Sequence, residues 1–122
     1  MQKASALSFA LLGGLALQFS PADLYAAPSP LVQVQLDVDG DGRADTVSIS
    51  SDGRVAVRRA DGISEALSFN QLPQLQGAFV EMWSGRGGAR FLRVEGRLLG
   101  GGRALLLSAL TSGRLQEIHN GP

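Results

Sequence analysis

Apolar and polar residues alternate along several short stretches of the chain after residue 30. This alternation runs through residues 32–36, 46–50, 55–57, 79–83, 91–99, 104–110 and 115–119. A period of two is typical of strands that bury one face. Turn-forming Asp-Gly, Ser-Gly and Gly-rich segments separate the stretches. The pattern therefore predicts an all-β fold: a small antiparallel meander, sandwich or open barrel of about six to eight short strands.

One hairpin is specific enough to predict its register. A three-residue loop, 51–53, pairs Ile49 with Val55 and Val47 with Val57, so that all four apolar side chains share one face. A two-residue loop would split this apolar set. We therefore expect the three-residue form, with Gly53 in the left-handed conformation.

Two further features are interpreted from their neighbours in the chain. Residues 64–76 are the one stretch after residue 30 that could hold a helical turn, which Pro73 would limit. Trp83 lies between apolar residues and is expected to belong to the core.

The first 26 residues have the pattern of an export signal. Lys3 is followed by an apolar stretch from residue 4 to residue 19, and small residues surround a cleavage position after Ala26. The apolar stretch is shorter than the roughly 18 to 20 residues that a membrane span needs. We therefore expect residues 1–26 to be a cleaved signal peptide, 27–30 a Pro-rich leader and 31–122 one small β domain. The protein would be exported, periplasmic or extracellular, without stable membrane insertion.

Composition removes several classes of function. The 122 residues carry 11 basic and 11 acidic side chains, so a zero net charge gives no reason to expect nucleic-acid binding. The absence of cysteine excludes disulfides, thiolate nucleophiles and sulfur-ligated zinc. The only histidine, His119, has no evident nucleophile beside it. We therefore expect no enzymatic activity and no catalytic residues.

The charges are divided unevenly along the predicted mature chain. Residues 27–81 contain eight acids and four arginines, whereas residues 82–122 contain two acids and six arginines. The net charge is −4 for the first segment and +4 for the second. The two halves could attract each other, or the basic half could face an anionic partner.

One loop carries a pattern with a definite chemistry. Residues 37–45 read Asp-Val-Asp-Gly-Asp-Gly-Arg-Ala-Asp, which places carboxylates at positions 1, 3, 5 and 9. Gly42 at position 6 permits a sharp bend, and the carbonyl of Arg43 at position 7 can coordinate a cation. Such a flexible set of hard oxygens suits Ca²⁺ better than Mg²⁺. The predicted metal ligands are Asp37, Asp39, Asp41, Arg43 and Asp45.

The loop differs from a complete EF-hand. Position 12 is Ser48, so the bidentate glutamate is missing, and the flanking segments alternate as strands rather than helices. The simpler interpretation is a solvated Asp/Gly turn, since these residues favour turns in any case.

Residues 37–47, Asp-Val-Asp-Gly-Asp-Gly-Arg-Ala-Asp-Thr-Val, resemble the calcium loop of FG-GAP/VCBS-type repeats, as found in integrin-α-like propellers. The resemblance covers a single copy at about residues 31–60 and implies the same five ligands, with Arg43 contributing its carbonyl. No Phe-Gly or Gly-Ala-Pro signature is present. The predicted mature chain is also too short for the minimum of about four propeller blades.

Three functions follow as hypotheses of different classes. The first is an exported β module that binds one structural Ca²⁺ and serves adhesion or assembly with a protein or surface partner. The second is a self-associating or partner-completing β-sheet protein in which metal binding is incidental. The third and weakest is a small metal-using hydrolase, for which the loop offers no nucleophile with its base.

Overall fold

The computed structural model describes residues 30–122. The predicted signal peptide and residues 27–29 of the leader therefore lie outside the described residues. In residues 30–122, none of the helical structure is both long enough and apolar enough to cross a membrane.

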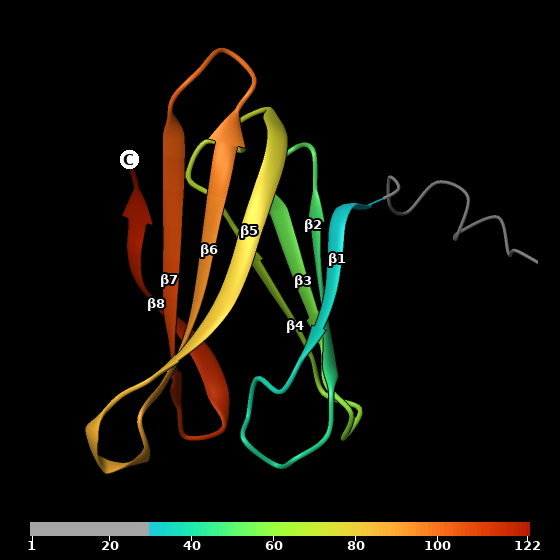
Figure 1. The fold of residues 1–122 in the computed structure, drawn as a ribbon, viewed down its shortest axis with the longest axis vertical. Helices are drawn as coiled ribbons and strands as arrows, with labels where there is room; N and C mark the ends of the chain where they lie inside the picture. Colours follow the sequence, from blue (N-terminus) through green and yellow to red (C-terminus); the bar gives the residue numbers. More distant parts are fainter. Residues whose placement is uncertain (1–29) are drawn as a thin grey trace, which may run out of the picture.

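Residues 30–122 form eight strands in two antiparallel sheets, which confirms the all-β prediction (Figure 1). Each sheet is a four-stranded meander, and the two sheets face each other as a sandwich. The N-terminal sheet contains β1 (Pro30–Leu36), β2 (Asp45–Ser50), β3 (Arg54–Arg58) and β4 (Ser64–Ser68). The C-terminal sheet contains β5 (Leu75–Ser84), β6 (Arg90–Leu98), β7 (Arg103–Thr111) and β8 (Arg114–Gly121).

The β2–β3 hairpin has the predicted register. Val47 pairs with Val57 and Ile49 with Val55, and all four side chains are buried. The N–H of Gly53 donates to the carbonyl of Ser50 (3.0 Å), and Gly53 has φ = +89°. The alternation of apolar residues therefore identified both the loop length and the residue that needs a left-handed backbone.

The core lies between the two sheets and receives alternate residues from both. The N-terminal sheet contributes Val47, Ile49, Val55 and Val57, and the C-terminal sheet contributes residues such as Leu92, Val94 and Leu106. Phe69, from the connection between the sheets, is also buried. A Cβ added at Gly96 would approach Leu75 Cδ2 to 2.8 Å, so this position leaves no space for a larger residue.

Two local predictions were wrong. Residues 64–76 hold no helix: they form strand β4, a turn and the start of β5. Trp83 is not in the core, because 46% of its surface is exposed. On β5, Ala78, Val80 and Met82 pack against the core, so Phe79 and Trp83 project from the opposite face of the sheet. Both faces of β5 carry large apolar residues, so their spacing alone did not identify the buried face.

Polar contacts join the two sheets along the edge formed by β4 and β8. Buried Arg59 donates to the carbonyl of Gly113 (2.6 Å) and lies 3.4 Å from the carboxylate of Glu65. Glu65 also accepts the N–H of Leu115 (2.8 Å). The Asn120 side chain accepts the N–H of Asn70 and donates to the carbonyl of Ser68, both at 2.9 Å.

Candidate metal centre

The acidic loop connects β1 to β2 at one end of the sandwich. Its first carboxylate, Asp37, accepts two backbone hydrogen bonds, from Gly40 to Oδ1 (2.7 Å) and from Gly42 to Oδ2 (2.9 Å). Gly40 and Gly42 both have positive φ, at +79° and +86°. These two glycines therefore allow the backbone to fold around the Asp37 carboxylate.

Asp45 is the first residue of β2, and its side chain is the most buried of the loop carboxylates. Only 1% of Asp45 is exposed. Its Oδ2 accepts the N–H of Val38 (2.7 Å), and its Oδ1 accepts the N–H of Ala60 from the β3–β4 turn (2.8 Å). Two backbone donors thus hold this carboxylate in a fixed orientation beside the loop.

Three of the predicted ligands come together. Asp37, Asp39 and Asp45 each offer an oxygen, and these oxygens lie within 4.8 Å of one another. The carboxylate of Asp41 instead binds Arg43: its Oδ1 accepts the Arg43 N–H (2.8 Å), and its Oδ2 accepts Arg43 Nε (3.1 Å). The side chains of Asp41 and Arg43 therefore neutralise each other at the exposed end of the loop.

Hydrogen bonds and burial act in opposite directions on the loop carboxylates. The backbone hydrogen bond from Gly42 lowers the pKa of Asp37, and the one from Arg43 lowers the pKa of Asp41. Desolvation raises the pKa of Asp39, and the neighbouring Asp41 and Asp45 charges act in the same direction. A cation among these oxygens would offset that repulsion.

The C-terminal sheet supplies a contact that the sequence did not reveal. Arg90, at the start of β6, donates through Nε to the carbonyl of Val38 (3.1 Å) and through Nη2 to the carbonyl of Asp37. A Cβ at Gly40 would lie 3.2 Å from Arg90 Cδ, so the side chain lies directly against the loop. Arg90 and Asp37 are 53 positions apart, and no local pattern predicts their contact.

The donor set fits a divalent hard cation. Three convergent carboxylates provide oxygen ligands and negative charge, which is the chemistry that Ca²⁺ prefers. Asp41 lies in the same loop, with both of its oxygens hydrogen-bonded to Arg43. Asp37, Asp39 and Asp45 are therefore the residues of this loop that could hold a metal ion.

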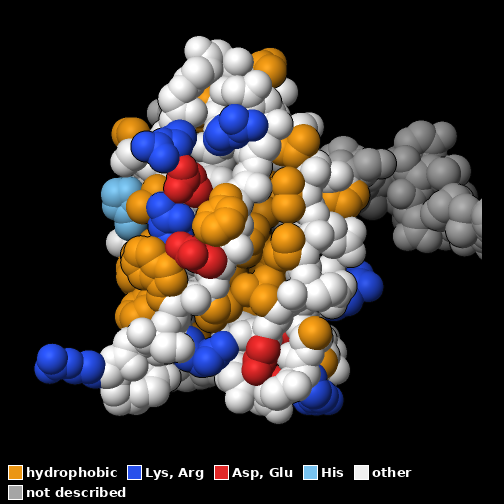
Figure 2. Space-filling view, viewed as in Figure 1, with side chains coloured by type: hydrophobic (Ala, Val, Ile, Leu, Met, Phe, Trp, Pro, Cys, Tyr) orange, Lys and Arg blue, Asp and Glu red, His pale blue; other side chains and the backbone are white. Residues whose placement is uncertain are grey.

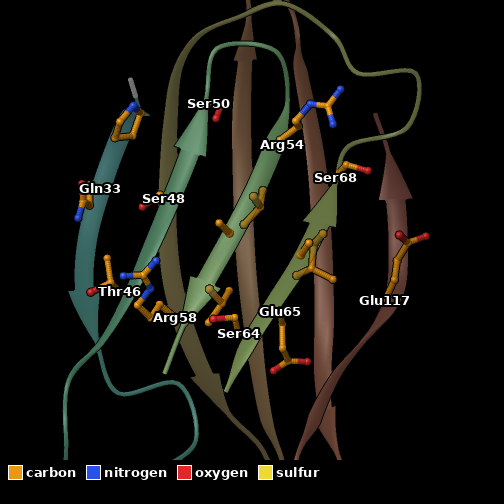
Figure 3. A pocket seen from close by; sticks show the side chains of 16 residues that line it. Gln33, Thr46, Ser48, Ser50, Arg54, Arg58, Ser64, Glu65, Ser68 and Glu117 are labelled. Atoms are coloured by element: carbon orange, nitrogen blue, oxygen red, sulfur yellow. The ribbon is translucent and has the colours of Figure 1, made fainter. Parts of the chain in front are cut away.

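A concave surface lies on the outer face of the N-terminal sheet, apart from the acidic loop (Figure 3). It has a volume of about 980 Å³, and small side chains such as Ala56, Ala66 and Ser48 contribute to its lining. Arg54 and Arg58 project from β3 at its two ends. Its lining includes hydroxyl groups and Glu65, but neither His119 nor the metal-loop carboxylates. The lining thus combines hydroxyl, carboxylate and guanidinium groups with apolar residues such as Val55 and Leu67.

No protein-family model, curated protein or solved structure matches this chain. The resemblance of residues 37–47 to the FG-GAP/VCBS calcium loop consequently stays a prediction.

Proposed function

We propose that the protein is a small exported β module that binds one structural Ca²⁺ at the loop 37–45 and serves adhesion or assembly. The observation that carries this proposal is the convergence of the Asp37, Asp39 and Asp45 oxygens within 4.8 Å. Asp41 and the carbonyl of Arg43 would complete the coordination, as the FG-GAP/VCBS-like pattern implies. Export is proposed from residues 1–26 alone.

The proposed role of the ion is structural. A β domain of about this size buries only about 60 to 70% of the surface of its unfolded chain, so its stability is expected to be marginal. Disulfides cannot add to that stability, since the chain has no cysteine. An ion present at tenfold excess over its dissociation constant would add about 1.4 kcal/mol.

The position of the loop explains how an ion would act on the whole sandwich. The loop joins β1 to β2, Asp45 contacts the β3–β4 turn through Ala60, and Arg90 reaches it from β6. Fixing the carboxylates would therefore stabilise contacts within the N-terminal sheet and between the two sheets. A rigid loop at this end could present the flanking strands β1 and β2 to a protein or surface partner.

A calcium titration tests the proposal. The chain from Ala27 onward, which keeps every described strand, would be titrated by calorimetry and its melting temperature followed. We expect saturable binding with a dissociation constant of about 0.1 to 1 mM, the range of extracellular calcium modules, and a rise in melting temperature. Asp39→Ala and Asp41→Ala should both abolish the heat and the rise.

Asp52→Ala provides a matched control. Asp52 binds the N–H and Nε of Arg54, just as Asp41 binds those of Arg43, but it lies in the β2–β3 turn. Its substitution should leave calcium binding unchanged. Absence of heat and of any melting shift up to about 10 mM Ca²⁺, well above the usual range, would reduce the loop to an acidic turn.

A further inference from the structure

The outer face of the C-terminal sheet exposes large apolar side chains around a row of charges (Figure 2). Phe79 and Trp83, both on β5, are 56% and 46% exposed. Phe91, Leu105 and Leu107 occupy the same face of β6 and β7 and are half-buried. We refer to these five residues as the apolar face. Its size is on the order of 300 Å², from strand spacings of about 4.8 Å and rises of about 3.4 Å per residue.

Four of the charged side chains on this face form one continuous row, and Arg97 lies on the same face beside Arg103. Arg93 lies between Glu81 (3.3 Å) and Glu95 (2.8 Å), and Arg103 binds the other oxygen of Glu95 (2.9 Å). The charge row therefore reads Glu81, Arg93, Glu95, Arg103, alternating in sign with a sum of zero. The guanidinium of Arg93 also lies over the Trp83 ring, 5.5 Å from its centre, which joins the row to the apolar face.

The two ends of the charge row are more exposed than its middle. The side chains of Arg93 and Glu95 are 21% and 19% exposed, whereas those of Glu81 and Arg103 are 35% and 72% exposed. Each end residue has one charged partner within the row, and Glu81 also accepts a hydrogen bond from Trp83 Nε1 (2.8 Å). An incoming surface that places a positive charge at Glu81 and a negative charge at Arg103 would complement both ends.

We propose that the apolar face and the charge row bind a second copy of this chain in a two-fold dimer. The two-fold axis would lie in the plane between the two facing sheets and run perpendicular to the row. The partner's row then runs in the opposite direction. A row of alternating sign then faces its own opposite: Glu81 meets the partner's Arg103, and Arg93 meets the partner's Glu95. The two-fold arrangement also brings the apolar faces together.

A second copy fits better than a uniformly charged partner because the signs in the row alternate. A uniformly acidic or basic surface would repel half of its members, whereas the reversed row complements all four. The apolar face is smaller than the roughly 800 Å² per partner of a standard stable interface. The dimer is therefore weak and reversible.

Sedimentation equilibrium of the chain from Ala27, from about 1 µM to about 1 mM, tests the dimer. We expect a reversible monomer–dimer equilibrium that is unaffected by removal of calcium. Glu81→Arg and Arg103→Glu each create two like-charge contacts in the dimer. Each should raise the dissociation constant at least about tenfold.

Mixing these two variants provides the decisive result. In a mixed dimer, Arg at position 81 of one copy meets Glu at position 103 of the other, and the native Arg103 meets the native Glu81. An equimolar mixture should therefore dimerise more tightly than either variant alone. A change that merely damaged the fold of one variant would not be rescued by mixing.

Asp52→Arg and Arg54→Glu serve as controls, because they create the same local charge conflicts in the β2–β3 turn. Both should associate as the unchanged chain does. The proposal is overturned if the unchanged chain is monomeric up to about 1 mM. It is also overturned if either row variant dimerises as tightly as the unchanged chain, or if the mixture associates no more tightly than the separate variants while circular dichroism shows both variants folded.

Discussion

At the scale of single residues, the turn between β2 and β3 depends on Gly53 for two separate reasons. Its φ of +89° lies in the left-handed region that side chains disfavour. A Cβ at this position would also approach Pro73 Cδ to 3.0 Å and the Pro73 carbonyl to 3.2 Å. Gly53 thus lets the hairpin close and lets the chain leading into β5 pass directly over it.

Gly53→Ala and Gly62→Ala separate these two effects. Gly62 has a similar φ of +94°, but nothing lies within 4 Å of the Cβ position. We expect Gly62→Ala to reduce the free energy of unfolding by about 1 kcal/mol through backbone strain alone. Gly53→Ala should cost about 1 to 2 kcal/mol more, because Pro73 must also move. Chemical denaturation measures both, and equal losses would show that the Pro73 contact adds nothing.

The residues of the acidic loop were predictable because their spacing is local, but their individual roles were not. The pattern identified the loop and its four carboxylates, and three of these come together. It did not show that Asp41 would bind Arg43, because hydrogen bonds from Arg43 and coordination of a cation use the same carboxylate oxygens. Arg90 could not be found at all, because it reaches the loop only through the packing of one sheet against the other.

At the scale of elements, the buried pair Arg59–Glu65 connects the β3–β4 hairpin to the β7–β8 hairpin. Arg59 is 4% exposed and binds the Gly113 carbonyl, while Glu65 binds Leu115 N–H and Arg114 Nε. Arg114 and Glu65 belong to the basic and acidic halves of the chain. The halves therefore attract each other in part through contacts within the molecule.

Arg59→Met should lower the free energy of unfolding by about 3 kcal/mol, because Glu65 keeps its buried charge but loses its buried charged partner. Adding Glu65→Gln removes that charge and keeps an acceptor for Leu115. The double variant should therefore be more stable than Arg59→Met alone, with a coupling above about 1 kcal/mol in a double-mutant cycle. Arg54→Met removes an exposed pair and should change stability by no more than about 0.5 kcal/mol. Additive single effects would argue against the pair as a connection.

The alternation of apolar and polar residues predicted most strands. It failed where a strand has a polar residue on its buried face or apolar residues on both faces. β4 is only five residues long and contains Glu65 on its buried side, so it lacks a clear apolar period. β5 has large apolar residues on both faces, which hides the distinction between core and surface. The wrong prediction that Trp83 belongs to the core is the direct result of that ambiguity.

At the scale of the whole molecule, acid should weaken the fold partly through the charge row. Hydrogen bonds from Arg93 and Arg103 lower the pKa of Glu95 below its ordinary value of 4.5. The folded state then binds fewer protons than the unfolded state, so this contribution is present above pH 4.5 and is lost as the pH falls through the lowered pKa. The lowered pKa values of Asp37 and Asp41 also make the fold less stable in acid, whereas the raised pKa of Asp39 has the opposite effect.

We expect the free energy of unfolding to decrease as the pH falls below 4.5, and Glu95→Gln to make this decrease less steep. Urea denaturation of dilute protein at several pH values measures the slope for each chain. An identical slope for the two chains would show that the row does not contribute to acid sensitivity.

The fold class was predictable from the sequence, whereas the pairing of the two sheets was not. Short alternating segments with frequent turns favour neighbouring antiparallel strands, and every strand pair in residues 30–122 joins consecutive strands. The packing of one meander on the other depends on distant contacts such as Arg59 with Gly113. These contacts leave no periodic signal in the chain.

The contacts of Asn120 have a consequence for the growth of assemblies. A sheet edge with unused backbone groups can recruit further strands without limit, which leads to fibres. Here the Asn120 side chain occupies the Ser68 carbonyl and the Asn70 N–H at the end of β4, and Asn70 in turn donates to the Asn120 carbonyl. Addition of a strand at this end would have to break these bonds. Association through a sheet face about a two-fold axis, by contrast, stops at two copies.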